Sequence, residues 1–141
     1  MAVQYELKPW IIDPAHSFYE LVSVSAFETN LEKLMKSKRR EDFSNLVRQI
    51  AKIMDYGVQK ACSTKKLRCL DASAGLYEIK GYSDPYRYMS YVMIGQPPLI
   101  VPMFEFVGHK GEGNIHNQIN HGLNIIKGAH ECLEELVMRK E

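Results

Sequence analysis

Residues 75–110 constrain the fold more than any other part of this 141-residue chain. Three runs rich in aromatic and β-branched residues follow one another there, and two turn signals, at 81–85 and 95–98, separate them. Short β-prone runs joined by turns that contain Gly and Pro are typical of an antiparallel meander. A sheet of this kind needs a second layer over its apolar face, so the rest of the chain has to supply that layer.

The segment before the meander predicts one strand followed by a helical hairpin. Aromatic and aliphatic residues dominate 18–24, which favours a strand. Ser25 and the Glu28 that follows it have the spacing of a capping box, which predicts that the first helix begins there. A second helix is expected over about 40–56, because apolar residues recur at three- and four-residue steps and Gly57 follows as a C-terminal cap.

The start of the chain is predicted to be an N-terminal arm over residues 1–16. Val3, Tyr5 and Leu7 alternate with polar residues in a weak strand pattern, which Pro9 and Pro14 interrupt. The arm would pair at a sheet edge or pack through Trp10, and the pattern does not choose between these two.

The other parts of the chain are a linker over 58–71 and one long helix over about 114–139. Gly122 and Gly128 lie inside that helix, and glycine there indicates a bend or a close approach to another element. We therefore expect an α+β fold with a single domain over 17–141. Its elements in chain order are a strand, a helical hairpin, a three-strand meander and a long C-terminal helix, and the strands form a small antiparallel sheet.

Composition indicates an ordinary globular protein of the cytoplasm. The hydrophobic fraction is 45% and the charged fraction 25%. No apolar run approaches the ~20 residues of a membrane span, and no signal-peptide core is present. Three cysteines, an odd number without metal-site spacing, favour reduced thiols, so we predict neither a metal nor a cofactor.

Two basic segments give the chain local positive charge although its net charge is only +1. The first contains Lys33, Lys36, Lys38, Arg39 and Arg40, and the second contains Lys60, Lys65, Lys66 and Arg68. Clustered cations favour binding of phosphate groups, and the alternative interpretation is two solvated turns.

Three motifs and the order of the elements resemble the RelE/HigB/ParE superfamily of bacterial toxins, especially its HigB-like, phage-derived branch. The motifs are Gly-Leu-Tyr-Glu-Ile-Lys at 75–80, Tyr-Arg-Tyr-Met-Ser-Tyr at 86–91 and Phe-Glu-Phe-Val at 104–107. They are similar to the family's Gly-Leu-Tyr-Glu-Leu-Arg strand, its Tyr-Arg strand and its Phe-Val-Lys-Lys strand end. The resemblance implies a toxin that a cognate antitoxin silences. Many members are metal-independent mRNA endonucleases that act on the ribosome, and some instead poison gyrase.

The resemblance also implies three catalytic residues. Arg87 matches the arginine of the family's second meander strand, and Lys80 matches a basic residue that ends the first. Gly108 and His109 stand where the family often has paired lysines, so His109 and Lys110 are the candidates for their roles, with His109 as the catalytic residue. Lys65, Lys66, Arg68, Lys110 and Tyr82 are expected to contact RNA, the four cations through phosphates and the tyrosine by stacking on a base.

These residue types suit RNA cleavage by the neighbouring 2′-hydroxyl. That reaction needs a base, an acid and cations that stabilise charge on the phosphate oxygens. An arginine binds phosphate through two donors, and a histidine titrates near neutral pH. The hypothesis requires Arg87 to project from the sheet toward solvent. An Arg87 held inward against a carboxylate would contradict the nuclease hypothesis, as would a surface that the terminal helix seals.

A second interpretation keeps the fold without the activity. The chain would then be a non-catalytic, phage-derived or regulatory interaction protein. The near-neutral net charge and the departure at Gly108 and His109 favour it. The C-terminal helix, which continues past residue 120, would offer a seam for a homodimer or for another partner.

Overall fold

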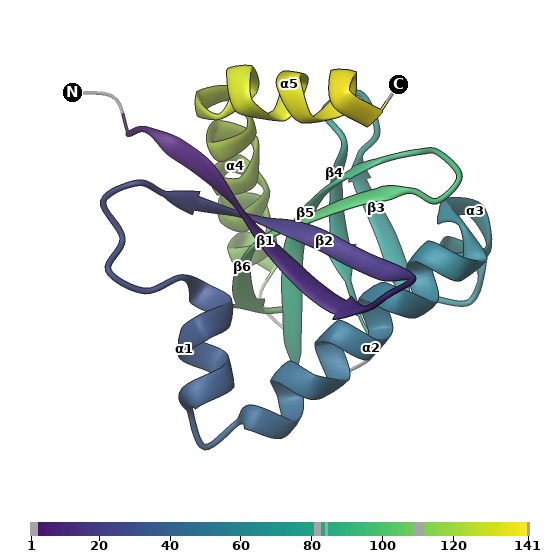
Figure 1. Ribbon diagram of the computed structural model, residues 1–141. Helices are drawn as coiled ribbons and strands as arrows, with labels where there is room; N and C mark the ends of the chain where they lie inside the picture. The colour runs from purple at the N-terminus through teal and green to yellow at the C-terminus, as the bar shows by residue number, and fades with distance from the viewer. Residues whose placement is uncertain (1–2, 81–82, 84, 109–111, 141) are drawn as a thin grey trace.

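The structure is a computed structural model that describes residues 3–80, 83, 85–108 and 112–140, with 112–114 and 140 described by their backbone alone (Figure 1). Its elements in chain order are β1 (Tyr5–Asp13), β2 (His16–Ser23), α1 (Asn30–Lys36), α2 (Arg40–Tyr56), α3 (Val58–Ser63), β3 (Leu67–Asp71), β4 (Leu76–Ile79), β5 (Tyr86–Met93), β6 (Leu99–Val107), α4 (Glu112–Gly128) and α5 (His130–Lys140). They form the predicted α+β fold, with a two-stranded sheet β1-β2 and a four-stranded antiparallel sheet β3-β4-β5-β6.

The predicted meander is present as β4, β5 and β6, and β3 extends it by one strand. β3 lies in the segment that was predicted to be a linker, as does α3. Leu67 pairs with Ile79 across β3 and β4, and both side chains are fully buried. This burial explains why the segment is ordered. It depends on pairing with another strand, so the local sequence alone does not indicate a strand here.

The segment predicted as an N-terminal arm contains β1, which pairs with β2 along its whole length. Pro9 does not end the strand, because β1 is an edge strand and an edge position tolerates a residue without a backbone N–H. The turn follows at 14–15, where Asp13 Oδ1 accepts a hydrogen bond of 2.8 Å from the Ala15 N–H. The resulting hairpin lies across the front of the four-stranded sheet, and β2 packs against β6 (Figure 1).

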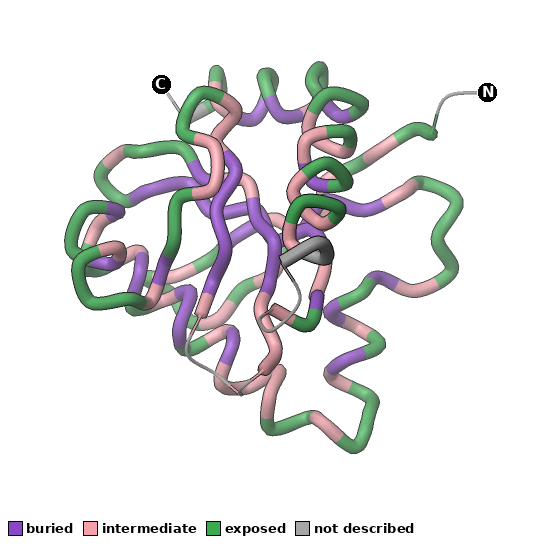
Figure 2. The backbone as a smooth tube through the Cα atoms, turned by 180° about the vertical axis from the view of Figure 1, so that it is seen from behind, coloured by how far each residue is buried: buried purple, intermediate pink, exposed green. Residues whose placement is uncertain are grey.

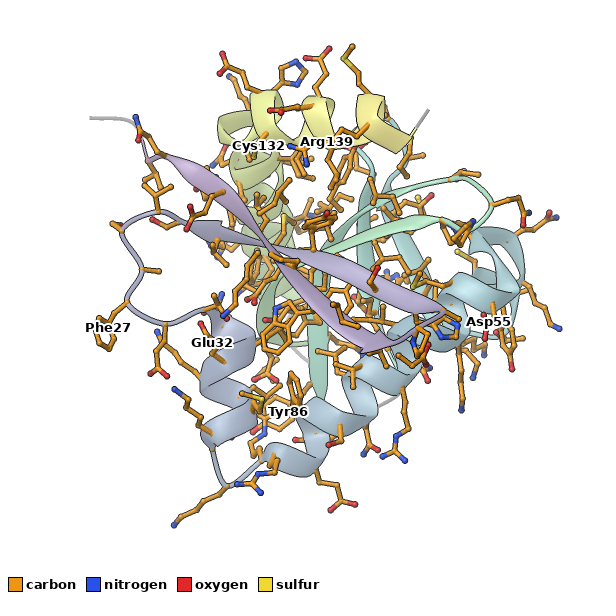
Figure 3. All side chains as sticks on the ribbon, in the orientation of Figure 1. Phe27, Glu32, Asp55, Tyr86, Cys132 and Arg139 are labelled. Atoms are coloured by element: carbon orange, nitrogen blue, oxygen red, sulfur yellow. The ribbon has the colours of Figure 1, made fainter. Side chains whose placement is uncertain are left out.

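The N-cap of the first helix lies four residues later than predicted. Thr29, not Ser25, is the N-cap of α1, and it forms a capping box with Glu32. Thr29 Oγ1 accepts from the Glu32 N–H at 3.0 Å, and Glu32 accepts from the Thr29 N–H at 2.9 Å. Phe27, which lies between Ser25 and Thr29, is fully exposed in the loop before α1 and points away from the protein (Figure 3). The prediction for α2 is confirmed, including Gly57 at its C-terminus with a φ of 84°.

Two apolar cores lie on opposite faces of the four-stranded sheet. The first core is formed with α1, α2 and α3 and contains Phe18, Leu31, Leu46, Ile50, Ile53, Tyr77, Ile79, Tyr88 and Ile100. The second core is formed with α4 and α5 and contains Leu21, Leu76, Met89, Val101, Met103, Phe106, Ala129, Leu133 and Leu136. Seen from behind, the central strands are largely buried and α4 runs beside them (Figure 2). β2 contributes Phe18 to the first core and Leu21 to the second, so the hairpin joins the two.

The predicted C-terminal helix is divided in two. α4 ends at Gly128, and α5 turns across the end of the molecule (Figure 1). A Cβ atom on Gly122 would lie 2.8 Å from Leu76 Cδ1 and 3.2 Å from Met89 Cγ. Gly122 therefore permits the close approach of α4 to the sheet, and Gly128 lies at the bend, as the sequence indicates.

A buried carboxylate in the hairpin forms a hydrogen bond with the backbone of α1. Glu20 is fully buried and accepts hydrogen bonds from the Trp10 indole N–H at 3.0 Å and from the Leu31 backbone N–H at 3.1 Å. Burial raises its pKa, and these donors oppose the rise. The Leu31 N–H belongs to the first turn of α1, so Glu20 also satisfies a donor that the helix itself leaves open.

Candidate nucleic-acid interface

Cationic side chains gather where β3 begins and β4 ends. We define the basic end of the sheet as Lys65, Lys66, Arg68, Lys80 and Arg87. Arg68 pairs directly with Glu78 across β3 and β4, and the Lys80 N–H donates to the Lys66 carbonyl oxygen at 2.9 Å. The antiparallel pairing thus brings residues 66 and 68 beside residue 80, and β5 adds Arg87 from the next strand.

Arg87 lies on the predicted face of β5 but does not point freely into solvent. Its Nε lies 3.5 Å from Oε1 of Glu78, and its Nη1 donates to the Tyr86 carbonyl oxygen at 2.9 Å. The Arg87 side chain is 16% exposed and that of Glu78 is 4% exposed. Because the guanidinium is held against a buried carboxylate, Arg87 is poorly placed to bind an RNA phosphate in this conformation.

Glu78 is a buried acid surrounded by cations. Burial raises its pKa, and the positive charges of Arg68, Arg87 and Lys80 oppose that rise. Sequence reasoning did not single out Glu78. The available signal was a lone acidic residue in an otherwise apolar strand, Leu76–Ile79, whose opposite partner in an antiparallel pairing is an arginine.

Gly108 explains how Arg87 can lie flat on the sheet. A Cβ atom at this position would be 2.7 Å from Arg87 Cγ and 3.2 Å from a ring carbon of Phe106. The Gly108 N–H donates to the Pro85 carbonyl oxygen at 3.0 Å, which holds this backbone close to the start of β5. A lysine here, as the resembling family often has, would displace the aliphatic stem of Arg87.

The remaining described cations at this end are more accessible. Lys65 and Arg68 are exposed, and Lys66 and Lys80 are half-buried. Lys65 has a φ of 62° in the turn between α3 and β3. Lys66 reaches toward the opposite side of the sheet, where its Nζ lies 5.8 Å from the ring centroid of Tyr56. Arg68 and Lys80 are therefore the cations best placed to meet a ligand on the face that carries Glu78.

Three predicted site residues lie outside the described residues: Tyr82, His109 and Lys110. Side chains alternate along a strand, so Tyr86 and Tyr88 lie on the opposite face of β5 from Arg87. Tyr88 is buried in the first core, and Tyr86 is half-buried on the same side of β5.

Arg39 forms a second polar centre, which the sequence suggested only as part of a basic run. Nη1 and Nη2 of its guanidinium donate to the two carboxylate oxygens of Glu105, each at 2.7 Å, and Nε donates to Asp42 at 2.8 Å. Its Cζ also lies 3.6 Å from the ring centroid of Tyr86, which lies between α1 and α2 (Figure 3). The hydrogen bonds to Glu105 raise the pKa of Arg39, so the guanidinium stays charged.

A pocket of about 330 Å³ opens beside Arg39. Its wall is formed by Asn30, Lys33, Leu34, Ser37, Arg39, Tyr88, Phe104 and Glu105. The side chain of Arg39 is 32% exposed and forms part of this wall. The available signal in the sequence was Glu105, an acid in an apolar strand, but its partner lies 66 positions away.

Comparisons of the chain with sequence models of known families, with curated proteins and with solved structures found no match. Within the described residues, no group of three or more His, Cys, Asp or Glu side chains is arranged to hold a metal ion. Cys62, Cys69 and Cys132 are free thiols. None of the described helices has the length and apolar character needed to cross a bilayer.

Proposed function

We propose that the protein binds single-stranded RNA at the basic end of the sheet and cleaves it without a metal. The observation that carries this proposal is the convergence of Arg68, Lys80 and Arg87 around the buried Glu78. Clustered cations on one sheet face, of which Arg68 is exposed and Lys80 half-buried, would supply the sequence-independent attraction for phosphates on which RNA binding depends. The net charge of the chain is only +1, so this attraction would come from the local cluster of cations rather than from the whole surface.

In this proposal the cations have different roles. Arg68 and Lys80 contact the phosphates, since they are the accessible pair on the face that carries Glu78. Arg87 acts as a positioning residue, which holds Glu78 and keeps positive charge next to the phosphate site. His109, which lies outside the described residues, is the residue to which the family resemblance assigns the role of acid or base.

The biological role that we propose follows the resemblance to the RelE/HigB toxins. The protein would cut mRNA on the ribosome in the cytoplasm, and a cognate antitoxin would silence it. The exposed side of α5, where Met138 is an exposed apolar residue, is the surface that we propose for a homodimer.

The test uses purified protein with labelled single-stranded RNA, alone and in a translating extract, with RNA ends mapped. Wild-type protein should produce ends with a cyclic or 3′-phosphate, because the 2′-hydroxyl is the nucleophile. Arg68→Ala and Lys80→Ala should each reduce cleavage, whereas Lys127→Ala, on the exposed side of α4, serves as the matched control for loss of one cation. Intact RNA at high protein excess in both settings would reject the endonuclease.

The burial of Arg87 favours the second candidate function, a non-catalytic interaction protein. An arginine side chain that is 16% exposed and paired with a carboxylate contributes to folding whether or not RNA is present. Under this alternative, RNA stays intact and induced expression leaves bacterial growth unchanged. Growth arrest together with new RNA ends supports the toxin.

A further inference from the structure

We infer that the pocket beside Arg39 binds one unpaired nucleobase, which stacks on the Arg39 guanidinium. The inference rests on the proposed function in that an RNA strand would supply the base, although the pocket chemistry fits a free nucleotide equally. The pocket volume of about 330 Å³ lies at the lower end of the range for small-molecule sites, as a ligand of one nucleotide requires.

The contacts of Arg39 leave its flat face as the part that is available to a ligand. Three of its N–H groups already donate to Glu105 and Asp42, so its plane is fixed and its in-plane donors are largely engaged. Tyr86 covers one face of the guanidinium and lies outside the wall of the pocket, whereas Arg39 forms part of that wall. The open face is therefore the one turned to the pocket.

The flat face of the guanidinium suits a base better than a phosphate. The carboxylates of Glu105 and Asp42 already occupy in-plane donors that would bind a phosphate at the edge of the guanidinium. Guanidinium planes are established stacking surfaces for unpaired bases. Lys33, an exposed residue at the wall, supplies one cation for the phosphate attached to that base.

Polar groups on the wall can also read the edge of the base. Asn30 donates its amide N–H to the Met103 carbonyl oxygen at 3.0 Å, which fixes the side chain and leaves its oxygen as an acceptor. Ser37 Oγ donates to the Leu34 carbonyl oxygen and accepts from the Arg39 N–H, so it stabilises the wall rather than the ligand. The Asn30 oxygen would accept a hydrogen bond that an exocyclic amine of the base donates.

The test measures quenching of 2-aminopurine fluorescence, which reports stacking. The probes are 2-aminopurine riboside 5′-monophosphate and a 2′-O-methyl RNA heptamer with one central 2-aminopurine, which lacks the free 2′-hydroxyl and so cannot be cut by that route. Wild-type protein should quench at least one of them. Arg39→Lys keeps the charge but loses the plane, and it should weaken binding about tenfold, in line with stacking on one base.

A second variant keeps the inference testable if Arg39→Lys fails to fold. Lys33→Phe fills the pocket and leaves every ion pair of Arg39 in place, so it should abolish quenching while the melting temperature stays near wild type. Lys38→Phe, an exposed neighbour outside the wall, is the matched control and should quench as wild type does. No quenching of either probe by wild type, or quenching by Lys33→Phe equal to wild type, would overturn the inference.

The two proposals fail separately. Quenching without cleavage of unmodified RNA keeps the base pocket and rejects the endonuclease. Cleavage without quenching rejects the pocket and keeps the endonuclease. Saturation by the monophosphate identifies a free nucleotide as the ligand, whereas quenching of the heptamer alone identifies an RNA strand.

Discussion

Arg87 and Glu78 lie on neighbouring strands of one sheet face, with Nε and Oε1 3.5 Å apart, and Glu78 is only 3% exposed. The pair is diagonal, because Glu78 lies opposite Met89 in the pairing of β4 with β5. A charge as deeply buried as Glu78 needs compensation, and Arg68, Arg87 and Lys80 supply it, with Arg87 in the closest printed ion pair. Under the proposed function, Arg87 would therefore serve the folded structure and the RNA site together.

Removal of Arg87 should destabilise the protein more than removal of the pair. Arg87→Ala leaves Glu78 buried without its nearest cation, and we expect a loss of about 3 kcal/mol in the free energy of unfolding. The double variant Arg87→Ala with Glu78→Gln should recover part of that loss, because the uncompensated charge is gone. Urea unfolding of both single variants and the double variant measures the coupling. Strictly additive effects would show that the two side chains do not interact energetically.

The basic end of the sheet should determine how RNA binding depends on salt. For single strands, each phosphate contact contributes about 0.7 to the slope of log K against log salt. Arg68→Ala and Lys80→Ala should each lower that slope by about this amount, and Lys127→Ala should leave it unchanged. Fluorescence anisotropy of a labelled RNA over a range of salt concentrations measures the slopes. Equal slopes for all four proteins would place the RNA elsewhere.

His16 should make the stability of the hairpin depend on pH. Its ring nitrogens contact Asp55 at 2.7 Å and Asp13 at 2.9 Å, and Asp55 lies beside the turn of the hairpin (Figure 3). These hydrogen bonds, that of Asp55 first, raise the pKa of His16 above its usual 6.5. The folded state thus binds the proton more tightly, so the stabilisation is fully present below pH 6.5 and is lost as the pH rises through the folded pKa.

The measurement for His16 compares melting temperatures across that range of pH. The difference between wild type and His16→Gln should be largest at acidic pH and should shrink as the pH rises. His130→Gln, which removes an exposed histidine paired with Glu134, is the control and should show a smaller pH-dependent difference. A wild-type advantage over His16→Gln that stays constant with pH would contradict the role of the charged imidazole.

Gly122→Ala should destabilise the protein although alanine favours a helix. The substitution gains about 1 kcal/mol of helix propensity, but its Cβ would meet the fully buried Leu76 at 2.8 Å. Overpacking of this kind typically costs about 1–3 kcal/mol, so the net effect should be a loss. Gly128→Ala meets only the Tyr5 ring, at 3.1 Å, and should cost less. The midpoints of urea unfolding at equal m-value rank the two variants, and a higher midpoint for Gly122→Ala would contradict the packing argument.

The parts of the fold that local sequence determines were predictable. The turns of the meander and the glycine after α2 are signals within a few residues, and the structure places these elements as expected. β1 and β3 were not recognised as strands, because Pro9 weakens the local pattern and Leu67 is ordered by its pairing with Ile79. The capping box was assigned to Ser25 rather than Thr29, since two Ser/Thr residues each precede a glutamate by three positions and only packing of α1 selects between them.

The candidate site was predictable in its residue types but not in its geometry. Sequence alternation places Arg87 opposite Tyr86 and Tyr88, and the burial of Tyr88 agrees with it. That Arg87 faces Glu78 follows from the register of β4 against β5, which no local signal encodes. The link between Arg39 and Glu105 joins the start of α2 to β6, so it depends on the complete tertiary arrangement.

The second core has a consequence for local unfolding of the protein. It joins Tyr5, Leu7 and Leu21, near the beginning of the chain, to Leu133 and Leu136 of α5. Fraying of α5 would therefore uncover the apolar side of the hairpin, and peeling of β1 would loosen α5 in turn. Amide hydrogens in these two segments, which are remote in the sequence, should exchange with solvent together. The two terminal segments would then open as one cooperative unit.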